Sequence, residues 1–354
     1  MSTAERGVND EGRGNTEGRK PVERISLEHG SGGALSRELT ERLIYPYFRG
    51  GSYAELADAT PFQLDGRGFL TTDTYVVDPP FFPGGDIGRL AVFGTCNDLS
   101  VSGAVPLALS LGMVIEEGFA LADLRRLLQS VKEAAEEAGV RVITGDTKVV
   151  PSGKGGGIYL NTAGVGRAMP GLALSPARIR RGDRVLVSAP VGAHGLAVLA
   201  ARESLQVGSA LRSDCANLHP LCAALASLGR ELRCMRDATR GGVAAIVNEL
   251  ASGSGLGMDL VEEDFPVEPV VAAAAGLLGL NPLEIANEGV LVAVVAEDAA
   301  ERALDRLRAH PLGSKARCAG SVTSGHPGRV ILETSIGGRR YLDMPRGLLL
   351  PRIC

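Results

Sequence analysis

Tryptophan is absent from this sequence, and the other aromatic residues are scarce, with eight Phe and six Tyr among 354 residues. That scarcity argues against an aromatic stacking platform for single-stranded nucleic acid. An excess of positive charge is also missing, because 37 Lys and Arg residues face 41 Asp and Glu residues, giving a formal net charge of −4. The chain carries no electrostatic footprint for nucleic acid, and we expect no nucleic-acid partner.

Long hydrophobic runs are missing too. The longest apolar stretch, residues 270–280, is rich in Ala and contains Gly276 and Gly279. It is far shorter than the ~20 residues that a membrane-spanning helix needs. The first residues hold no apolar segment of the kind found in signal peptides. We therefore expect neither membrane insertion nor secretion.

Cysteine pairs of the CxxC type are absent, which argues against a zinc ribbon, an iron–sulfur site or a disulfide framework. The same scattered spacing favours reduced thiols and a cytoplasmic protein. The histidines show no ligand spacing such as HxxxH, and no Ser-His-Asp triad can be assigned. The six cysteines are Cys96, Cys215, Cys222, Cys234, Cys318 and Cys354.

Glycine, by contrast, is abundant: the chain has 47 glycines, about twice the usual share of roughly 7%. Residues 1–24 are polar and have no periodic apolar face, which predicts a disordered tail. From Ile25 onward, strand-like and helix-like patterns alternate. We predict strands at 68–77, 107–115, 140–144, 158–165, 184–188, 290–295, 317–322 and 329–333, and helices at 86–102, 120–138, 196–204, 243–251 and 299–309.

An irregular seam at residues 170–181 separates two series of such elements. Each series mixes strands and helices with few strict βαβ repeats, which predicts an α+β protein of two domains. We place the N-terminal domain at 25–170 and the C-terminal domain at 171–340. Residues 341–354 contain two prolines and are predicted to form an extended tail.

Acidic residues recur at the ends of the predicted elements, and Asp98 is the most informative of them. It falls at helical spacing from Ile87, Ala91 and Gly94, on the face expected to be buried. A carboxylate on such a face needs a partner. Two interpretations are equally open: a ligand for Mg²⁺, or a salt bridge to an arginine. The other acidic residues are Asp73, Asp78, Asp86, Asp146, Asp237 and Glu288.

Asp86 directly precedes a predicted helix, so a helix N-cap is a strong alternative to ligand binding. Asp73 is harder to dismiss, because Asp is disfavoured within strands and the carboxyl end of a strand often faces a ligand. Asp146 and Lys148 leave another predicted strand end in the same way. Together they would present a metal ligand and a cation for a phosphate or an oxyanion.

Three glycine-rich loops are candidates for phosphate contact, since glycine lets backbone N–H groups approach phosphate oxygens. None matches a known nucleotide-binding pattern, and plain turns are the stronger interpretation of each loop taken alone. The loops are HGSGG (29–33), SGKGGG (152–157) and TRGG (239–242).

Cys354 is the final residue of the sequence. A thiol at the end of a proline-stiffened segment could act as a carrier arm, and residues 346–354 could reach roughly 30 Å when stretched. From the residues alone, an accidental terminal cysteine is the better interpretation. A prenyl anchor is excluded, because prenylation needs Cys four residues from the end.

Several segments together resemble one family, the HypE hydrogenase maturation factors, over nearly all of the chain from Ile25. The middle segment also resembles the wider superfamily of aminoimidazole ribonucleotide synthetase and selenophosphate synthetase, and the terminal PRIC distinguishes HypE from those relatives. The segments are HGSGG, TTDTYVVDPPFFPGGDIGRLAVFGTCNDLSVSGA, TGDTKVV, DATRGG, ANEG and PRIC.

The resemblance implies a two-domain α+β fold like that of aminoimidazole ribonucleotide synthetase, whose N-terminal domains pair as a homodimer through a β-barrel-like interface. It also implies a reaction. The carbamoyltransferase HypF places a carbamoyl group on the Cys354 sulfur, and ATP then drives its dehydration to a thiocyanate. The cyano group passes to iron held by the HypC–HypD complex during [NiFe]-hydrogenase assembly.

The resemblance further implies roles for individual residues. Cys354 carries the group, Glu288 is the base that takes protons from the carbamoyl nitrogen, and Lys148 stabilises a developing oxyanion or the transferring phosphoryl group. Mg²⁺ would be bound by Asp73, Asp98 and Asp237. The nucleotide-binding residues would be these three together with Gly32, Gly33, Asp86, Asn97 and Asp146.

Two other functions stay open on the residues alone. An enzyme that phosphorylates a free small molecule would turn over ATP without Cys354. A scaffold of cluster assembly would show no nucleotide-dependent change at Cys354. The acidic element ends and glycine-rich loops count against the scaffold, and the terminal PRIC counts against the small-molecule enzyme.

Overall fold

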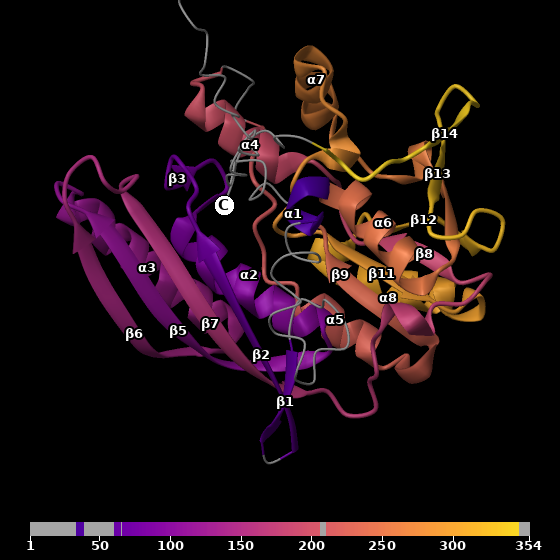
Figure 1. The fold of residues 1–354 in the computed structure, drawn as a ribbon, viewed down its shortest axis with the longest axis horizontal. Helices are drawn as coiled ribbons and strands as arrows, with labels where there is room; N and C mark the ends of the chain where they lie inside the picture. Colours follow the sequence, from indigo (N-terminus) through magenta and orange to yellow (C-terminus); the bar gives the residue numbers. More distant parts are fainter. Residues whose placement is uncertain (1–32, 39–59, 65, 206–209, 347–354) are drawn as a thin grey trace, which may run out of the picture.

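The computed structural model describes residues 33–38, 60–64, 66–205 and 210–346. Two sheets, one from each half of the chain, lie side by side with helices packed on them (Figure 1). The predicted tail at 1–24, Gly32 and Cys354 lie outside the described residues. Among the residues that are described, no helix is both long enough and apolar enough to cross a membrane.

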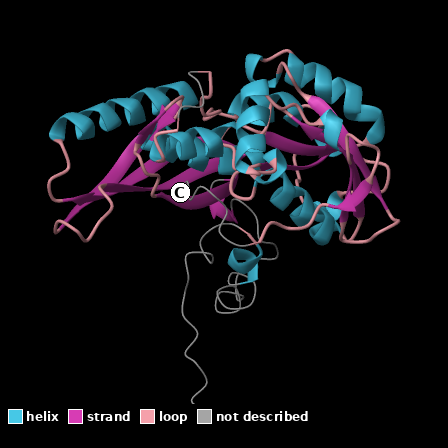
Figure 2. Ribbon diagram, turned by 90° about the horizontal axis from the view of Figure 1, so that it is seen from above, coloured by secondary structure: helices cyan, strands magenta, loops and turns pink. Residues whose placement is uncertain are grey.

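The first sheet has the strand order β1-β2-β7-β5-β6, and β5 and β6 are parallel while the other neighbours are antiparallel. Helix α3 lies over one face of this sheet (Figure 2). The elements of this half are α1 (Ala34–Glu38), β1 (Thr60–Leu64), β2 (Gly66–Tyr75), β3 (Phe81–Phe82), β4 (Gly85–Asp86), α2 (Ile87–Val101), β5 (Ala104–Glu116), α3 (Leu121–Ala138), β6 (Arg141–Val150) and β7 (Ile158–Ala168).

Helix α2 packs between the first sheet and the second half of the chain, and nearly all of its residues are buried. It can approach β2 closely because residue 94 is glycine: a Cβ there would lie 2.2 Å from the Tyr75 hydroxyl oxygen. Helix α3 shows the predicted amphipathic pattern and ends where predicted, at Gly139, whose φ of 67° favours glycine.

The second sheet has the order β14-β13-β10-β12-β8-β11-β9. Strand β11, next to the edge strand β9, is buried on both faces, with α6 packed on one side and α5 and α8 on the other. The elements are β8 (Arg184–Val187), α4 (Ala193–Arg202), α5 (His219–Ala226), β9 (Leu232–Asp237), α6 (Gly242–Ser254), β10 (Gly257–Val261), α7 (Pro269–Leu278), β11 (Leu291–Val295), α8 (Ala300–Arg308), β12 (Arg317–Thr323), β13 (Val330–Glu333) and β14 (Arg339–Tyr341).

Every predicted strand and helix has a counterpart in the structure, but one boundary error matters for function. The strand predicted to end at Thr144 continues to Val150, so Asp146 and Lys148 lie within β6 rather than beyond its end. The extension follows from parallel pairing with β5, because Glu116 at the end of β5 pairs with Val150. Several elements were not predicted, namely α1, β1, β3, β4, α5, β9, β10, α7 and β14.

The two halves are joined by side-chain contacts between α2 and the segment that precedes α5. The Asn97 amide donates to the Ala216 carbonyl oxygen at 3.0 Å, and its oxygen accepts the Leu218 N–H at 2.8 Å. Elsewhere at the junction the rings of Phe82 and His194 meet edge-on, with their centroids 5.4 Å apart. Fully satisfied buried amides of this kind fix the position of one half against the other.

Candidate active site at the junction of the two halves

Five acidic side chains, each within electrostatic reach of Tyr75 or of Glu288, lie where the two halves meet. Asp73 and Asp98 act on Tyr75 together with Glu288, and Glu288 in turn feels Asp73, Asp214 and Asp237. They come from β2, from α2, from the end of β9 and from two connecting segments. We call this set, Asp73, Asp98, Asp214, Asp237 and Glu288, the carboxylate cluster.

Glu288 is a member of the carboxylate cluster that the sequence had singled out, and its surroundings strongly perturb its pKa. Only 6% of its surface is exposed. Burial is the main cause that raises its pKa well above the usual value, and the charges of Asp214, Asp237 and Asp73 raise it further. Arg240 opposes this shift. A carboxylate in such surroundings holds a proton more tightly and is a stronger base once ionised.

The residue before Glu288 explains how the ANEG motif is held. Asn287 is fully buried, and its oxygen accepts the Gly192 N–H at 2.6 Å. Its amide nitrogen donates to the carbonyl oxygens of Ala238 and Ile285 at 2.8 and 3.2 Å. Asn287 therefore holds this segment against the loop that follows β9, directly after Asp237.

Asp237 is the last residue of β9 and is 6% exposed. The glycines that follow it allow the chain to turn tightly into α6. Gly241 and Gly242 have φ values of 78° and 60°, which favour glycine. A Cβ at Gly242 would also lie 2.6 Å from the carbonyl oxygens of Leu283 and Ile285. The loop 239–242 thus packs directly against the segment that leads into Glu288.

Asp98 lies on α2 and Asp73 on β2, where these two elements pack against each other. The Thr71 hydroxyl donates to Asp98 Oδ2 at 3.0 Å. Asp73 pairs with buried Thr162 in the sheet register, so its side chain lies on the face that α2 covers. It is half-buried, and its Oδ1 accepts the Thr74 N–H at 2.8 Å.

No closed metal cage is present among the residues that the structure describes: no three His, Cys, Asp or Glu side chains lie close enough together to hold a metal ion. Asp73, Asp98 and Asp237 belong to one electrostatic cluster but do not form a preassembled three-ligand site.

Two other residues predicted to bind nucleotide, Asp86 and Asn97, make contacts that hold the fold together. Asp86 is the N-cap of α2, as the alternative interpretation held: its Oδ1 accepts the Gly88 and Arg89 N–H groups at 2.8 and 3.0 Å. The Ser130 hydroxyl donates to the same carboxylate. Both polar atoms of the Asn97 amide have backbone partners, which favours a positioning role over a direct contact with nucleotide.

Asp146 and Lys148 are not brought to the carboxylate cluster within one chain. They pair with each other at 2.9 Å on the outer strand of the first sheet, and both are about two-thirds exposed. Lys148 pairs with Val114, which is exposed, whereas Asp73 shares the face that α2 covers. Lys148 and Asp73 therefore lie on opposite faces of the first sheet and three strands apart, about 14 Å at ~4.8 Å per strand.

The other two glycine-rich loops differ in what they contact. In the loop 152–157, the N–H groups of Gly153 and Gly157 donate to the Glu116 carboxylate, so a protein carboxylate holds the place where a phosphate was considered. Gly33 is buried against the chain's other end, because a Cβ there would lie 2.6 Å from the Pro345 carbonyl oxygen.

Asp214 was not predicted as a site residue, because it belongs to none of the motifs described above. Burial raises the pKa of Asp214 to about 6 despite several backbone N–H donors. Its neighbour Cys215 is also affected: burial and the charges of Glu288 and Asp214 raise the pKa of this thiol well above its usual value. Cys215 is therefore a neutral thiol beside the carboxylate cluster, not a nucleophile.

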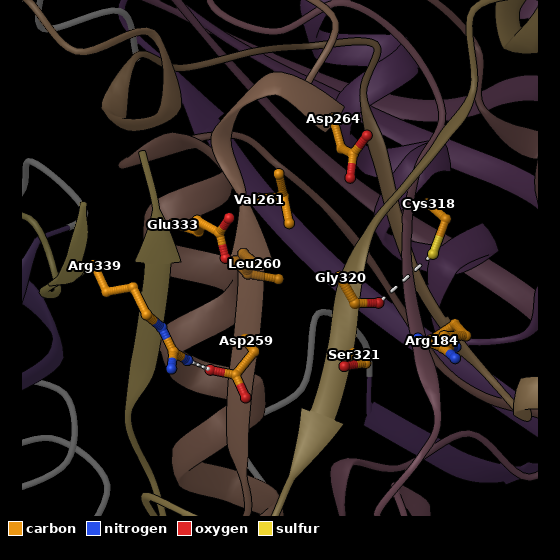
Figure 3. A pocket seen from close by; sticks show the side chains of 10 residues that line it. All are labelled: Arg184, Asp259, Leu260, Val261, Asp264, Cys318, Gly320, Ser321, Glu333 and Arg339. Atoms are coloured by element: carbon orange, nitrogen blue, oxygen red, sulfur yellow. Dashed lines mark hydrogen bonds and ion pairs between the residues drawn. The ribbon is translucent and has the colours of Figure 1, made fainter. Parts of the chain in front are cut away.

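A separate pocket of about 250 Å³ lies on the second sheet, on strands β8, β10, β12, β13 and β14 (Figure 3). Its lining includes none of the predicted site residues. Within it Arg339 pairs with Asp259, and Arg184 pairs with Glu297 at its edge. It contains no member of the carboxylate cluster, and we do not take it as the candidate active site.

Comparison with known proteins matches both halves of the chain to family models. Residues 57–168 match the N-terminal domain of AIR synthase related proteins, and residues 180–333 match their C-terminal domain. Among solved structures, a HypE–HypF complex is 42% identical with a TM-score of 0.82, covering 87% of this chain and 99% of that one. A HypE in complex with ATP is 42% identical with a TM-score of 0.79, covering 93% and 99%.

Curated relatives named carbamoyl dehydratase HypE agree in length as well as in sequence. The protein of Azotobacter vinelandii is 47% identical, over 93% of this chain and 97% of its own length. That of Bradyrhizobium diazoefficiens is 49% identical, over 93% and 96%. With both AIR synthase related domains present and this degree of identity over almost its full length, the chain belongs to the HypE family of hydrogenase maturation proteins.

Proposed function

We propose that this protein uses ATP to dehydrate a carbamoyl group on the Cys354 sulfur to a thiocyanate, the source of cyanide for the iron of [NiFe]-hydrogenase. Family membership supports a role in hydrogenase maturation as a carbamoyl dehydratase. The observation that carries the proposal is the carboxylate cluster around the buried Glu288, which suits proton removal beside a bound phosphate group.

The reaction needs ATP because hydroxide is a poor leaving group. Attack of the carbamoyl oxygen on the γ-phosphorus breaks the bond to ADP and turns that oxygen into part of a phosphate ester. Loss of the two nitrogen protons and of phosphate then breaks the C–O bond and leaves the S–C≡N group. Carbamoyl thioester and ATP thus give thiocyanate, ADP, phosphate and one proton.

Glu288 would take the proton from the carbamoyl nitrogen, which positive charge development on phosphorylation makes more acidic. Its burial and acidic neighbours suit this role, because they strengthen the base. Asp73, Asp98 and Asp237 would hold Mg²⁺, which when bound neutralises phosphate charge. Mg²⁺ in such sites shares its ligand positions among carboxylates, substrate phosphates and water, so the phosphates of ATP would complete the set.

Lys148 and Asp146 enter this proposal through a second copy of the chain. Their strand β6 is an outer strand with apolar side chains exposed on both faces: Val142 is 37% exposed, Ile143 63% and Val149 68%. An exposed apolar edge of this kind invites pairing with another sheet. We propose a homodimer through this sheet, in which Lys148 and Asp146 serve the site of the other copy.

Charged residues at this surface should therefore separate the two copies. We expect wild-type protein to be a dimer by analytical ultracentrifugation, and the double variant Ile143→Glu, Val149→Glu to be a monomer. Leu277→Glu is the matched control, because Leu277 is 87% exposed on α7 of the other half. A monomeric wild type, or equal dissociation of the control, would contradict the interface.

The partners follow from the chemistry and from the relatives. A HypF-type carbamoyltransferase would load Cys354, in keeping with the solved HypE–HypF complex. A HypC–HypD complex would accept the cyano group, and the reduced thiol that the reaction requires suits the cytoplasm.

The direct test is the intact mass of the Cys354-carbamoylated protein before and after MgATP. We expect the adduct to lose the mass of one water. The Cys354→Ala variant should take up no adduct and show no such change. An unchanged wild-type adduct with continued ATP hydrolysis would instead identify an enzyme acting on a free small molecule. An unchanged adduct without nucleotide binding would identify a scaffold.

A further inference from the structure

Asp214 is a member of the carboxylate cluster that no motif of the sequence singles out. We propose that Asp214 is a positioning residue, whose carboxylate holds the backbone of Glu288 and Gly289 and so fixes where the Glu288 side chain is presented. This inference rests on the role proposed for Glu288 as base.

The geometry shows one carboxylate receiving several backbone donors at once. The Glu288 N–H lies 3.3 and 3.2 Å from the two Asp214 oxygens, and the Gly289 N–H donates to Oδ2 at 2.9 Å. The amides of His194 and of Asp214 itself also act on this carboxylate. In the reverse direction, the Ala216 N–H donates to the Glu288 carbonyl oxygen at 3.3 Å.

Glu288 is therefore clamped from both sides. Asn287 fixes the preceding residue to the loop after β9, and Asp214 fixes the following peptide to the segment before α5. With the main chain held at both neighbours, the freedom left to Glu288 is that of its own side chain. Such clamping is how a base is kept in reach of its proton without reorganisation during the reaction.

Gly289 completes the contact and gives a reason for the last residue of the ANEG motif. A Cβ at this position would lie 1.9 Å from the Asp214 carbonyl oxygen and 3.0 Å from its carbonyl carbon. Both are backbone atoms, so they cannot be moved aside by a side-chain rotation. Any residue other than glycine would force the Asp214 segment away from Glu288.

The charge of Asp214 works in the same direction as its hydrogen bonds. After burial, the charge of Asp214 is the largest cause that raises the pKa of Glu288. Its own carboxylate is half-buried and surrounded by N–H donors rather than by a cation among the contacts described. One residue thus sets both the position and the basicity of the other.

Asparagine at position 214 would separate these contributions from simple packing, because it keeps the shape and loses the charge. An amide has one oxygen, so its NH₂ group would face one of the two N–H donors that the carboxylate accepts. We expect Asp214→Asn to remain folded but to let the Glu288–Gly289 peptide shift. A misplacement of ~1 Å in a reacting group costs roughly 100-fold in rate.

The experiment measures the dehydration of Cys354-carbamoylated protein by intact mass at a series of ATP concentrations. For Asp214→Asn we expect kcat to fall about 10- to 100-fold while the KM for ATP stays within about twofold of wild type. Ser188→Ala is the matched control: Ser188 is fully buried and accepts the Leu291 N–H at 2.9 Å, three residues beyond Glu288. It should lower the melting temperature while leaving kcat within about twofold.

The outcomes separate this inference from the proposed function. If the wild type releases no water, the proposed function fails. If the wild type reacts and Asp214→Asn matches it, or if Ser188→Ala slows the reaction equally, the positioning role is wrong. Should Asp214→Asn not fold, Gly289→Ala perturbs the same contact from the other side. A folded Gly289→Ala variant with unchanged kcat would overturn the proposal as well.

Discussion

Replacing Glu288 by glutamine should leave the carbamoylated protein able to bind MgATP but unable to release water from the adduct. The side chain keeps its size and its place in the carboxylate cluster, and only the ability to take a proton is lost. Removal of a positioned general base costs roughly 100- to 10,000-fold in rate. Intact mass after single turnover, together with calorimetric titration of ATP, would show the loss of chemistry with retention of binding.

The pH dependence gives this prediction a second readout. A base acts when ionised, and the pKa of Glu288 is raised, so the wild-type rate should climb with pH across a range well above that of an ordinary glutamate. The Gln variant's residual rate should lack this limb. The charged or titratable groups near Glu288 are Asp73, Tyr75, Asp214, Cys215, Asp237 and Arg240.

Folding stability should respond with the opposite sign. Because folding raises the pKa of Glu288, protonated Glu288 is the form favoured in the native protein, and its contribution is complete below the unfolded value of 4.5. That contribution is lost as the pH rises through the native pKa. The Glu288→Gln variant should therefore gain melting temperature relative to wild type as the pH increases.

Glu284→Gln is the matched control, since Glu284 lies four residues earlier, is half-buried and accepts from the Asn281 amide at 2.9 Å. It should dehydrate the adduct at the wild-type rate. Retention of more than about a tenth of the wild-type activity by Glu288→Gln would show that Glu288 is not the general base, because loss of such a base costs roughly 100-fold or more in rate.

The second large effect is expected from Asp98→Asn, this time on the nucleotide. The amide can still accept the Thr71 hydroxyl, so the packing of α2 on β2 is kept. What is lost is a negative charge that Mg²⁺ requires, and we expect the apparent affinity for MgATP and the dehydration rate together to fall by at least about 100-fold. Titration of MgATP, followed by the mass of the adduct, would measure both.

Asp123→Asn controls for loss of an acidic side chain elsewhere in the same half, because Asp123 lies in the first turn of α3 and is also half-buried. Its MgATP affinity should match wild type. Raised magnesium offers a further check: excess Mg²⁺ should recover part of the Asp98→Asn activity if the defect is in metal binding. Unchanged MgATP affinity in Asp98→Asn would remove this residue from the nucleotide site.

Features governed by local rules could be predicted from the sequence. Helix α3 was placed within a residue at each end, because its amphipathic period and Gly139 are both local signals. The capping alternative for Asp86 was correct for the same reason, since an N-cap needs only its own first turn. Asp237 and Glu288 were recognised as site residues from the family motifs, and the structure places both in the carboxylate cluster.

Features that depend on distant pairing could not be predicted. The length of β6 is set by its partner β5, so Asp146 and Lys148 were placed beyond a strand that in fact continues through them. Asp214 lies in an irregular segment with no periodicity, and its contacts reach Glu288 and Gly289, 74 and 75 residues away. Nothing in its local sequence indicates a carboxylate that serves another segment.

The contacts of Asn97 have a consequence for how this molecule can move. The same short segment, residues 214–218, bonds to Asn97 beside Asp98 and to the backbone at Glu288. A hinge opening between the halves would have to break both Asn97 bonds together, each costing roughly 1–3 kcal/mol if left unsatisfied. In the proposed function, the side that would meet the nucleotide and the side that would meet the carbamoyl nitrogen are thus held against each other by the segment 214–218. We therefore expect turnover to be timed by arrival and departure of the tethered substrate rather than by closure of the domains around it.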